Sequence, residues 1–408
     1  MQNINTYVRV TAVLLLVVGI YACDQPTTQV HEEQNEPSVL ENEQAIESQY
    51  IVVFKDSDAK GKALSDPDRV EALRNEVLDE YSIDRSAVVG RYNVALKGFA
   101  AKLSDKMLAG LKKDDRIKYI EKDRFITLAP PGACSPWPSC KDGDGGGDSG
   151  QVVPWGVQRI GGATGSNGTA WVIDTGVDLD HPDLNVDTGR SAVFVSRGPG
   201  SGSPDDGNGH GTHVAGTIAA LDNDIDVVGV AAGATVVAVK VLDDRGSGSY
   251  SGVIGGIDYV AANAAPGDVA NMSLGGSTSD AVDDAVRNAA DQGIYFAVAA
   301  GNDGADANNY SPARVEYKNV WTVSATDDTD AFASFSNWSG PTDPPVEFAA
   351  PGVDILSLWL DGGTDTISGT SMASPHVAGL LLVTNGSPAS DGTASGDPDG
   401  DPDPIAHN

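Results

Sequence analysis

The chain has 408 residues, of which 58 are acidic and 26 basic, and its formal net charge at neutral pH is −32. A charge of this sign and size excludes a nucleic-acid-binding protein, whose surface has to attract phosphates. The length predicts more than one domain.

The first 23 residues are typical of an export signal. One arginine precedes an apolar run over residues 13–20, which is too short to span a membrane. Residues 20–23, Ile-Tyr-Ala-Cys, look like a bacterial lipobox. We expect residues 1–22 to be a signal peptide and Cys23 to carry a lipid, with ordinary cleavage and an incidental cysteine as the alternative. The protein would then be extracellular or in the cell envelope, and in contact with a membrane only through Cys23.

Residues 23–48 are rich in Gln, Glu and Asn, and this composition predicts a flexible spacer. The following segment, residues 49–128, predicts a small α+β domain with the order β-α-β-β-α-β. Its expected strands are 49–55, 87–96, 98–103 and 117–123, and its expected helices are 68–81 and 104–112. This segment carries 16 basic and 14 acidic residues, whereas residues 151–386 carry 8 and 29. The two parts should therefore attract each other at low salt.

Residues 129–153 form a linker rich in Gly, Asp and Pro. Cys134 and Cys140 lie in it and can pair locally, which would leave Cys23 as the lipid acceptor. The glycine- and aspartate-rich stretch 141–148 either binds calcium or is simply flexible.

Three glycine-bearing motifs follow, and each contains a residue type that acid–base or nucleophilic catalysis uses. They are 172–176 (Val-Ile-Asp-Thr-Gly), 208–216 (Asn-Gly-His-Gly-Thr-His-Val-Ala-Gly) and 369–376 (Gly-Thr-Ser-Met-Ala-Ser-Pro-His). Asp174 ends a short apolar run, which predicts a buried parallel strand with the carboxylate at the ligand-binding edge of a sheet. His210 and Ser371 each begin a helical pattern.

In this order the motifs resemble those of subtilisin-like serine proteases, whose triad runs Asp, His, Ser. The resemblance is to the proteinase K branch, and it implies that Ser371 is the nucleophile, His210 the general base and Asp174 the carboxylate that orients it. It also implies an oxyanion-hole amide at Asn302, which ends the apolar stretch 296–301. The fold implied is α/β, a mostly parallel sheet flanked by helices in a catalytic domain over residues 154–386. Residues 49–128 would be an inhibitor-type propeptide, released by cleavage between about 128 and 153.

The same resemblance implies which residues contact a protein or peptide substrate. One wall of the specificity pocket is expected from Ser273, Leu274 and Gly275, and the other from Ala300 and Gly301. The edge strand that pairs with an extended peptide is expected from Gly246, Ser247 and Gly248. Small wall residues imply broad endopeptidase activity with large apolar residues preferred before the cut. No cofactor is implied for catalysis.

The acidic composition has three explanations: calcium binding, adaptation to high salt, and solubility. The resemblance implies a structural Ca²⁺ site at Pro312, Val315 and Glu347, although Glu347 stands where the branch usually has aspartate. Residues 387–408 contain five aspartates and no lysine or arginine, so we expect a disordered acidic tail and a core that is incomplete or continued in a longer chain.

Two alternatives to a general protease remain open. One is a non-catalytic envelope lipoprotein that uses the fold to bind peptides, but such a module needs no nucleophile. The other is an enzyme that cuts only itself and keeps its propeptide as a permanent inhibitor.

Overall fold

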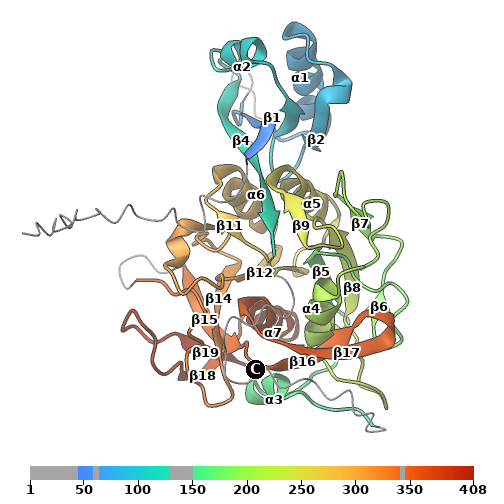
Figure 1. Cartoon of the computed structure of the whole chain (residues 1–408), viewed down its shortest axis with the longest axis vertical. Helices are drawn as coiled ribbons and strands as arrows, with labels where there is room; N and C mark the ends of the chain where they lie inside the picture. The colour runs from blue at the N-terminus through green and yellow to red at the C-terminus, as the bar shows by residue number, and fades with distance from the viewer. Residues whose placement is uncertain (1–44, 58–63, 129–149, 341–344) are drawn as a thin grey trace, which may run out of the picture. The chain divides into compact units, whose positions relative to one another are not determined.

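The computed structural model describes residues 45–57, 64–128, 150–340 and 345–408 (Figure 1). The predicted signal peptide, Cys23, Cys134, Cys140 and residues 141–148 lie outside the described residues. Within the described part, no helix has the length and apolar character needed to cross a membrane.

Residues 45–128 have the predicted β-α-β-β-α-β order. The elements are β1 (Ala45–Phe54), α1 (Pro67–Glu80), β2 (Val88–Tyr92), β3 (Gly98–Lys102), α2 (Asp105–Leu111) and β4 (Ile117–Thr127). Strand β1 lies between β3 and β4 and is antiparallel to both. Because Ala45 already pairs with Arg124 of β4, the prediction that the flexible spacer extends to residue 48 is wrong in its last residues.

The larger part of the chain is built on the predicted mostly parallel sheet, with the strand order β18-β19-β15-β14-β12-β10-β5-β8-β6 and with β7 also paired to β8. Its strands are β5 (Thr169–Asp174), β6 (Asn185–Val186), β7 (Ala192–Val193), β8 (Thr235–Lys240), β10 (Val269–Met272), β12 (Tyr295–Ala299), β14 (Val320–Thr326), β15 (Val346–Pro351), β18 (Ala389–Thr393) and β19 (Pro404–His407). Parallel strands need both faces covered, and the central strands β5, β8, β10, β12 and β14 are buried accordingly. The edge strands β6, β7 and β18 are partly or fully exposed.

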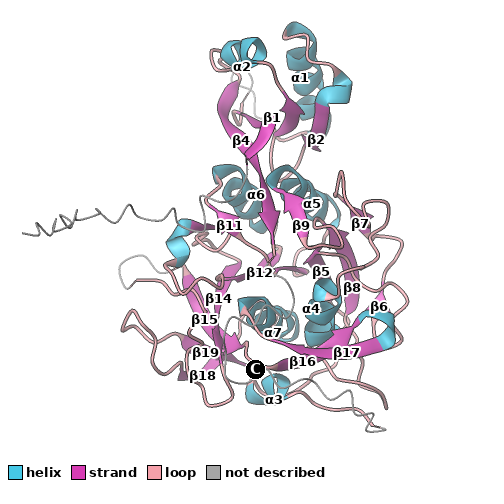
Figure 2. Ribbon diagram, viewed as in Figure 1, coloured by secondary structure: helices cyan, strands magenta, loops and turns pink. Residues whose placement is uncertain are grey.

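Helices cover the two faces of this sheet (Figure 2). On one face, α5 (Tyr250–Asn263) and α6 (Asp280–Ala290) pack on alternate strand residues such as Trp171 and Ile173. On the other, α4 (His210–Ala219) and α7 (Thr370–Val383) pack on the intervening residues such as Ala170 and Val172. The alternation follows from the two-residue period of a strand.

Shorter elements complete the described chain. They are α3 (Trp155–Arg159), β9 (Ser247–Ser249), the antiparallel pair β11 (Gly276–Ser277) and β13 (Tyr310–Ser311), and the antiparallel pair β16 (Ile355–Trp359) and β17 (Gly363–Ile367). Strand β9 pairs with β4 and so joins the sheet of the first domain to the larger part of the chain.

The prediction of a disordered tail at 387–408 is wrong. Strand β19 extends the main sheet through the pairing of Ile405 with Ala349, and β18 pairs with β19. Ile405 and Ala406 are fully buried. The composition of the segment is dominated by aspartate, so these two apolar residues did not indicate a strand. The acidic stretch forms the connecting loop, in which Asp401 N–H donates to Asp399 and Asp403 N–H donates to Asp397.

Candidate active site

Asp174 and His210 are in direct contact. Asp174 ends β5 and is fully buried, and its Oδ1 lies 2.8 Å from Nδ1 of His210. Burial lowers the pKa of His210, but the charge and hydrogen bond of Asp174, together with the charge of Asp206, raise it above its ordinary value. Asp174 therefore favours the protonated imidazole and fixes which ring nitrogen faces it.

His210 is the first residue of α4, and the turn before it requires glycine. Gly209 has φ +107°, and a Cβ there would lie 2.3 Å from an indole carbon of Trp359. This left-handed conformation and the close approach of Trp359 make a side chain at Gly209 unfavourable. The glycine thus sets the direction in which α4 starts and in which the imidazole leaves the backbone.

Ser371 lies in the first turn of α7, close to the end of β10. Its hydroxyl donates to the carbonyl of Ser273 at 3.2 Å, and the hydroxyl of Ser273 donates back to the carbonyl of Ser371 at 2.7 Å. A buried chain continues from there, because Ser374 donates to Asn271 at 2.7 Å. The structure therefore holds Ser371 against Ser273, one of the residues implied to contact substrate.

Asn302 follows β12 and its side chain is directed toward the start of α7. Its Oδ1 accepts hydrogen bonds from the N–H of Thr370 at 2.8 Å and from the hydroxyl of Thr370 at 2.9 Å. Because the oxygen is occupied, the amide nitrogen is the end left to donate. That nitrogen lies 3.5 Å from the position that a Cβ on Gly369 would take, two residues before Ser371.

The edge strand implied to bind substrate is paired with the end of the first domain, the expected propeptide. Phe125, Ile126 and Thr127 of β4 pair antiparallel with Ser249, Gly248 and Ser247, respectively. The N–H of Leu128 then donates to the carbonyl of Gly246 at 2.9 Å. Ile126 is buried among apolar residues of the catalytic domain, including Leu242 and Tyr250. Figure 1 shows β4 running from the first domain to β9.

The implied wall residues are also near the chain segments just described. Leu274 and Ala300 are buried, and Gly301 N–H donates to the hydroxyl of Thr370 at 3.1 Å. At Gly275 the space that a Cβ would enter is open except for the carbonyl of Ser311 at 3.6 Å.

Carboxylates that the sequence did not single out hold the two domains together. Asp123 accepts from Ser251 N–H, at the start of α5, at 3.1 Å, and Glu121 accepts from Ala281 N–H, at the start of α6, at 3.1 Å. Asp258 of α5 accepts the N–H groups of residues 93–96 at 2.7–3.2 Å. Two of these contacts place a negative charge at a helix N-terminus, where it is favourable.

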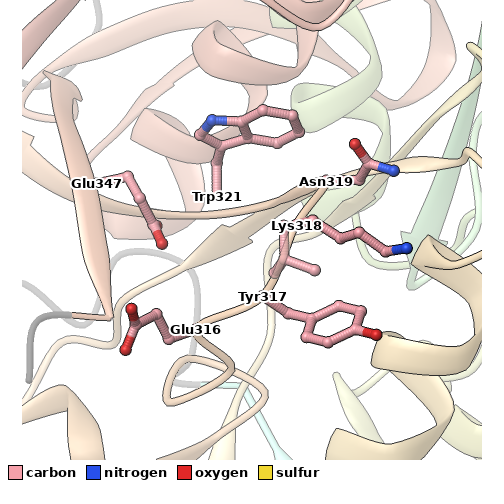
Figure 3. Close-up of a pocket in the computed structure, with 7 residues that line it drawn as sticks. Glu316, Tyr317, Lys318, Asn319, Trp321 and Glu347 are labelled. Atoms are coloured by element: carbon pink, nitrogen blue, oxygen red, sulfur yellow. The ribbon is translucent and has the colours of Figure 1, made fainter.

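Glu347 lines an open cavity of about 340 Å³. In Figure 3 its carboxyl group points toward that of Glu316, while Tyr317 and Lys318 extend to the other side. Pro312 and Val315, its expected partners in a calcium site, do not line this cavity. The expected site combines backbone carbonyls with the Glu347 carboxylate, and it stays a prediction. Burial raises the pKa of Glu347 to about 9, and the charges of Glu316 and Asp403 add to this rise.

A second group of oxygen atoms surrounds the amide nitrogen of Gln151. This nitrogen contacts the carbonyl oxygens of Leu221, Ile225 and Val227 and the side-chain oxygen of Asn223 at 2.6–3.4 Å. Asn223 also donates to Oδ1 of buried Asp183 at 2.6 Å, whereas Oδ2 of Asp183 has no hydrogen-bond partner. Burial raises the pKa of Asp183 to about 6. In the described residues no three His, Cys, Asp or Glu side chains form a metal cluster, so a cation here would rely on carbonyl oxygens.

Comparisons with known proteins agree with both domains. The profile of the subtilase family matches residues 167–389, and that of peptidase inhibitor I9 matches residues 49–129. Alkaline serine exoprotease A of Vibrio alginolyticus is 42% identical over 356 residues, which are 83% of this chain and 60% of that protein. Proteinase R of Parengyodontium album is 38% identical over 88% of this chain and 86% of its own length.

Two further relatives have similar identity. The extracellular serine proteinase of Thermus sp. strain Rt41A is 39% identical over 84% of this chain and 82% of its own length. A solved cold-adapted subtilisin-like serine proteinase is 43% identical, with a TM-score of 0.47 over 57% of this chain and 84% of its own.

Proposed function

Since the chain belongs to the subtilase family of serine proteases and carries an inhibitor I9 domain, we propose that it is an exported endopeptidase made as a zymogen. The observation that carries the proposal is the buried contact between Asp174 and Nδ1 of His210, in the chain that also holds Ser371 at a helix start. A relative described as extracellular, from Thermus sp. strain Rt41A, supports export, and the lipid on Cys23 stays part of the proposal.

In the proposed reaction His210 takes the proton of Ser371 as the hydroxyl attacks the substrate carbonyl. Asp174 holds the imidazole in the correct tautomer and stabilises the imidazolium that forms. The proton then passes to the leaving amine, and water releases the acyl group by the same steps in reverse. The raised pKa of His210 supports this role, because the charged ring is favoured once it forms.

Asn302 is proposed to donate its amide to the oxyanion of the tetrahedral intermediate. The occupied Oδ1 supports this, because it leaves Nδ2 as the free donor beside the start of α7. Loss of one such donor lowers kcat by about 10²–10³, a magnitude measured in subtilisin itself.

Substrate is proposed to bind as an added strand on β9, as β4 does. Such pairing reads the main chain and leaves selectivity to side-chain pockets. The apolar surroundings of Ile126 and the small residues Gly275, Ala300 and Gly301 support a preference for apolar side chains, with large ones before the cut.

Calcium is proposed as a structural ion, without a part in the chemistry. The oxygen donors around Asp183 and Asn223 and the paired carboxyl groups of Glu316 and Glu347 suit a hard cation. The buried, unpartnered Oδ2 of Asp183 supports the first position. When bound, the ion would supply the positive charge that these buried oxygens lack. Removing calcium should lower the melting temperature of the wild type and have less effect on Asp183→Asn.

The first test compares residues 24–408 with the same chain carrying Ser371→Ala, both expressed with calcium and followed by gel and intact mass. The wild type should lose about 100–130 residues, and the variant should stay whole. If both are cut alike, or both stay whole while folded, the proposal fails.

The pairing of β4 with β9 favours a second candidate, an enzyme that cuts only itself. Hydrolysis of added peptides by the processed protein would exclude it.

A further inference from the structure

Asp206 is a buried carboxylate next to the Asp174–His210 pair, and no motif singled it out. It is 7% exposed and precedes α4. Its Oδ1 accepts from the hydroxyl of Thr175 at 3.0 Å and from the N–H groups of Asn208 at 2.9 Å and Gly209 at 3.1 Å. Its Oδ2 accepts from the N–H of Thr212 at 3.0 Å and the hydroxyl of Thr212 at 2.7 Å. All five partners donate, as an ionised carboxylate requires.

These contacts determine how α4 begins. The N-cap residue, Gly209, has no side chain to cap the helix, so the first N–H groups need other acceptors. Asp206 accepts from Thr212, the hydroxyl of Thr175 accepts from Gly211 N–H at 2.9 Å, and Asn208 accepts from His210 N–H at 3.3 Å. Because Thr175 directly follows Asp174, one carboxylate connects the backbones of both members of the pair.

The charges around His210 leave Asp206 with an electrostatic role as well. The titratable neighbours of His210 are Asp174 at the end of β5, Asp206 in the loop before α4 and His213 one turn further along α4. Burial lowers the pKa of His213 to about 3, so that ring is neutral. The ammonium of Lys240 on β8 donates to the carbonyl of Thr175 and pairs with Asp244 at 2.9 Å. Within the described residues, Asp174 and Asp206 are thus the negative charges that raise the pKa of His210.

We propose that Asp206 is a positioning residue, which fixes His210 against Asp174 and provides a second negative charge for the imidazolium. The proton moves from Ser371 Oγ to His210 and then to the leaving amine, and Asp206 exchanges none. The inference rests on the proposed function, because this imidazolium arises only if His210 is the general base.

The test is the pH profile of kcat/KM for Asp206→Asn and Asp206→Glu in the processed enzyme. On the acid side of the profile, the acid limb, activity falls as His210 becomes protonated. Removing the charge of Asp206 should lower the pKa of this limb by roughly 0.5–1 unit and kcat by roughly tenfold, with KM little changed. Asp206→Glu should restore the acid limb, though not the full kcat.

The matched control is Asp283→Asn, which removes another buried carboxylate, paired with Arg314 in the α6 region. It should lower the melting temperature and leave the acid limb in place. An Asp206→Asn enzyme with a lower melting temperature and an unshifted acid limb would reduce Asp206 to a helix cap and overturn the proposal.

Two further measurements keep the inference separate from the proposed function. In the full chain carrying Ser371→Ala, an NMR titration of His210 should show a lower pKa with Asp206→Asn, and this needs no catalysis. An equal pKa overturns the inference. Wild type that lacks peptidase activity overturns the proposed function while this titration still reports on Asp206.

If Asp206→Asn does not fold, Thr175→Val is the alternative. It removes the hydrogen bond between Asp206 and the residue next to Asp174 but keeps the charge of Asp206. It should lower kcat without moving the acid limb, and wild-type kcat would contradict positioning.

Discussion

The core of the main sheet and the interface between the two domains are stabilised in different ways. Trp171, Ile173 and Phe296 of the core are fully buried among apolar neighbours. The interface shares this apolar cluster through residues such as Leu96 and Ile126. It also has carboxyl groups, those of Glu121, Asp123 and Asp258, that accept backbone N–H groups from the other domain. Such hydrogen bonds replace bonds to water, and their net gain is small compared with apolar burial. The interface therefore depends in part on hydrogen bonds that can be exchanged for bonds to water, whereas the core does not.

The largest effect should come from truncating the core. Phe296→Ala removes a ring from the centre of the sheet and should lower the free energy of unfolding by about 3–5 kcal/mol. Chemical denaturation of the Ser371→Ala chain measures this without self-digestion. Release of the processed propeptide from the molecules that remain folded should be unchanged. A faster release would mean that core and interface are coupled, and would break the distinction.

Ile405→Ala tests whether the C-terminal strand belongs to the same core. Ile405 is fully buried and pairs with Ala349, so we expect a loss of about 2–4 kcal/mol in the same measurement. A matched control is Ser390→Ala on exposed β18, which should have almost no effect. Equal, negligible effects of both would restore the interpretation of residues 387–408 as a tail.

The sequence was most informative where a side chain's chemistry and its local pattern coincide. Asp174 at a strand end and His210 and Ser371 at helix starts could be placed by pattern, and so could the propeptide elements within a few residues. Asp206 and Gln151 could not, because their roles depend on which backbone groups the fold brings to them. Ile405 was missed because two buried residues among aspartates carry little weight in composition. Pro312 and Val315 do not line the cavity beside Glu347, and the calcium site that they were expected to form stays a prediction.

Asp258→Ala should weaken the interface with little effect on the core. Asp258 accepts four N–H groups of residues 93–96, and leaving buried donors unsatisfied costs about 1–3 kcal/mol in total affinity. The dissociation constant of the propeptide from the processed enzyme should therefore rise by roughly 10- to 100-fold. Activity released on dilution, followed with a peptide substrate, measures it. Unchanged release, or a fall in the melting temperature of the free catalytic domain as large as that for Phe296→Ala, would contradict this assignment.

The smallest expected effect is a pH dependence of the same release. Burial in the interface raises the pKa values of Glu121 and Asp123, although their hydrogen bonds to the catalytic domain oppose the rise. A carboxyl group with a raised pKa in the complex binds protons more tightly there than when free. Its contribution to binding is therefore fully present below the pKa of the free group and is lost as the pH rises through the pKa in the complex.

Propeptide binding should accordingly weaken as the pH rises from about 4 toward neutral, by less than tenfold per pH unit for each group. Glu121→Gln with Asp123→Asn should flatten this dependence, while Asp114→Asn, which alters a carboxylate paired with Arg116 within the propeptide, should preserve it. A release that becomes faster toward acid pH would show that protonation breaks the helix-capping contacts more than it relieves burial. The charges of these carboxylates would then stabilise the interface in addition to its apolar contacts, whereas the core would still be held by apolar area. The interface would then depend on pH more strongly than the core.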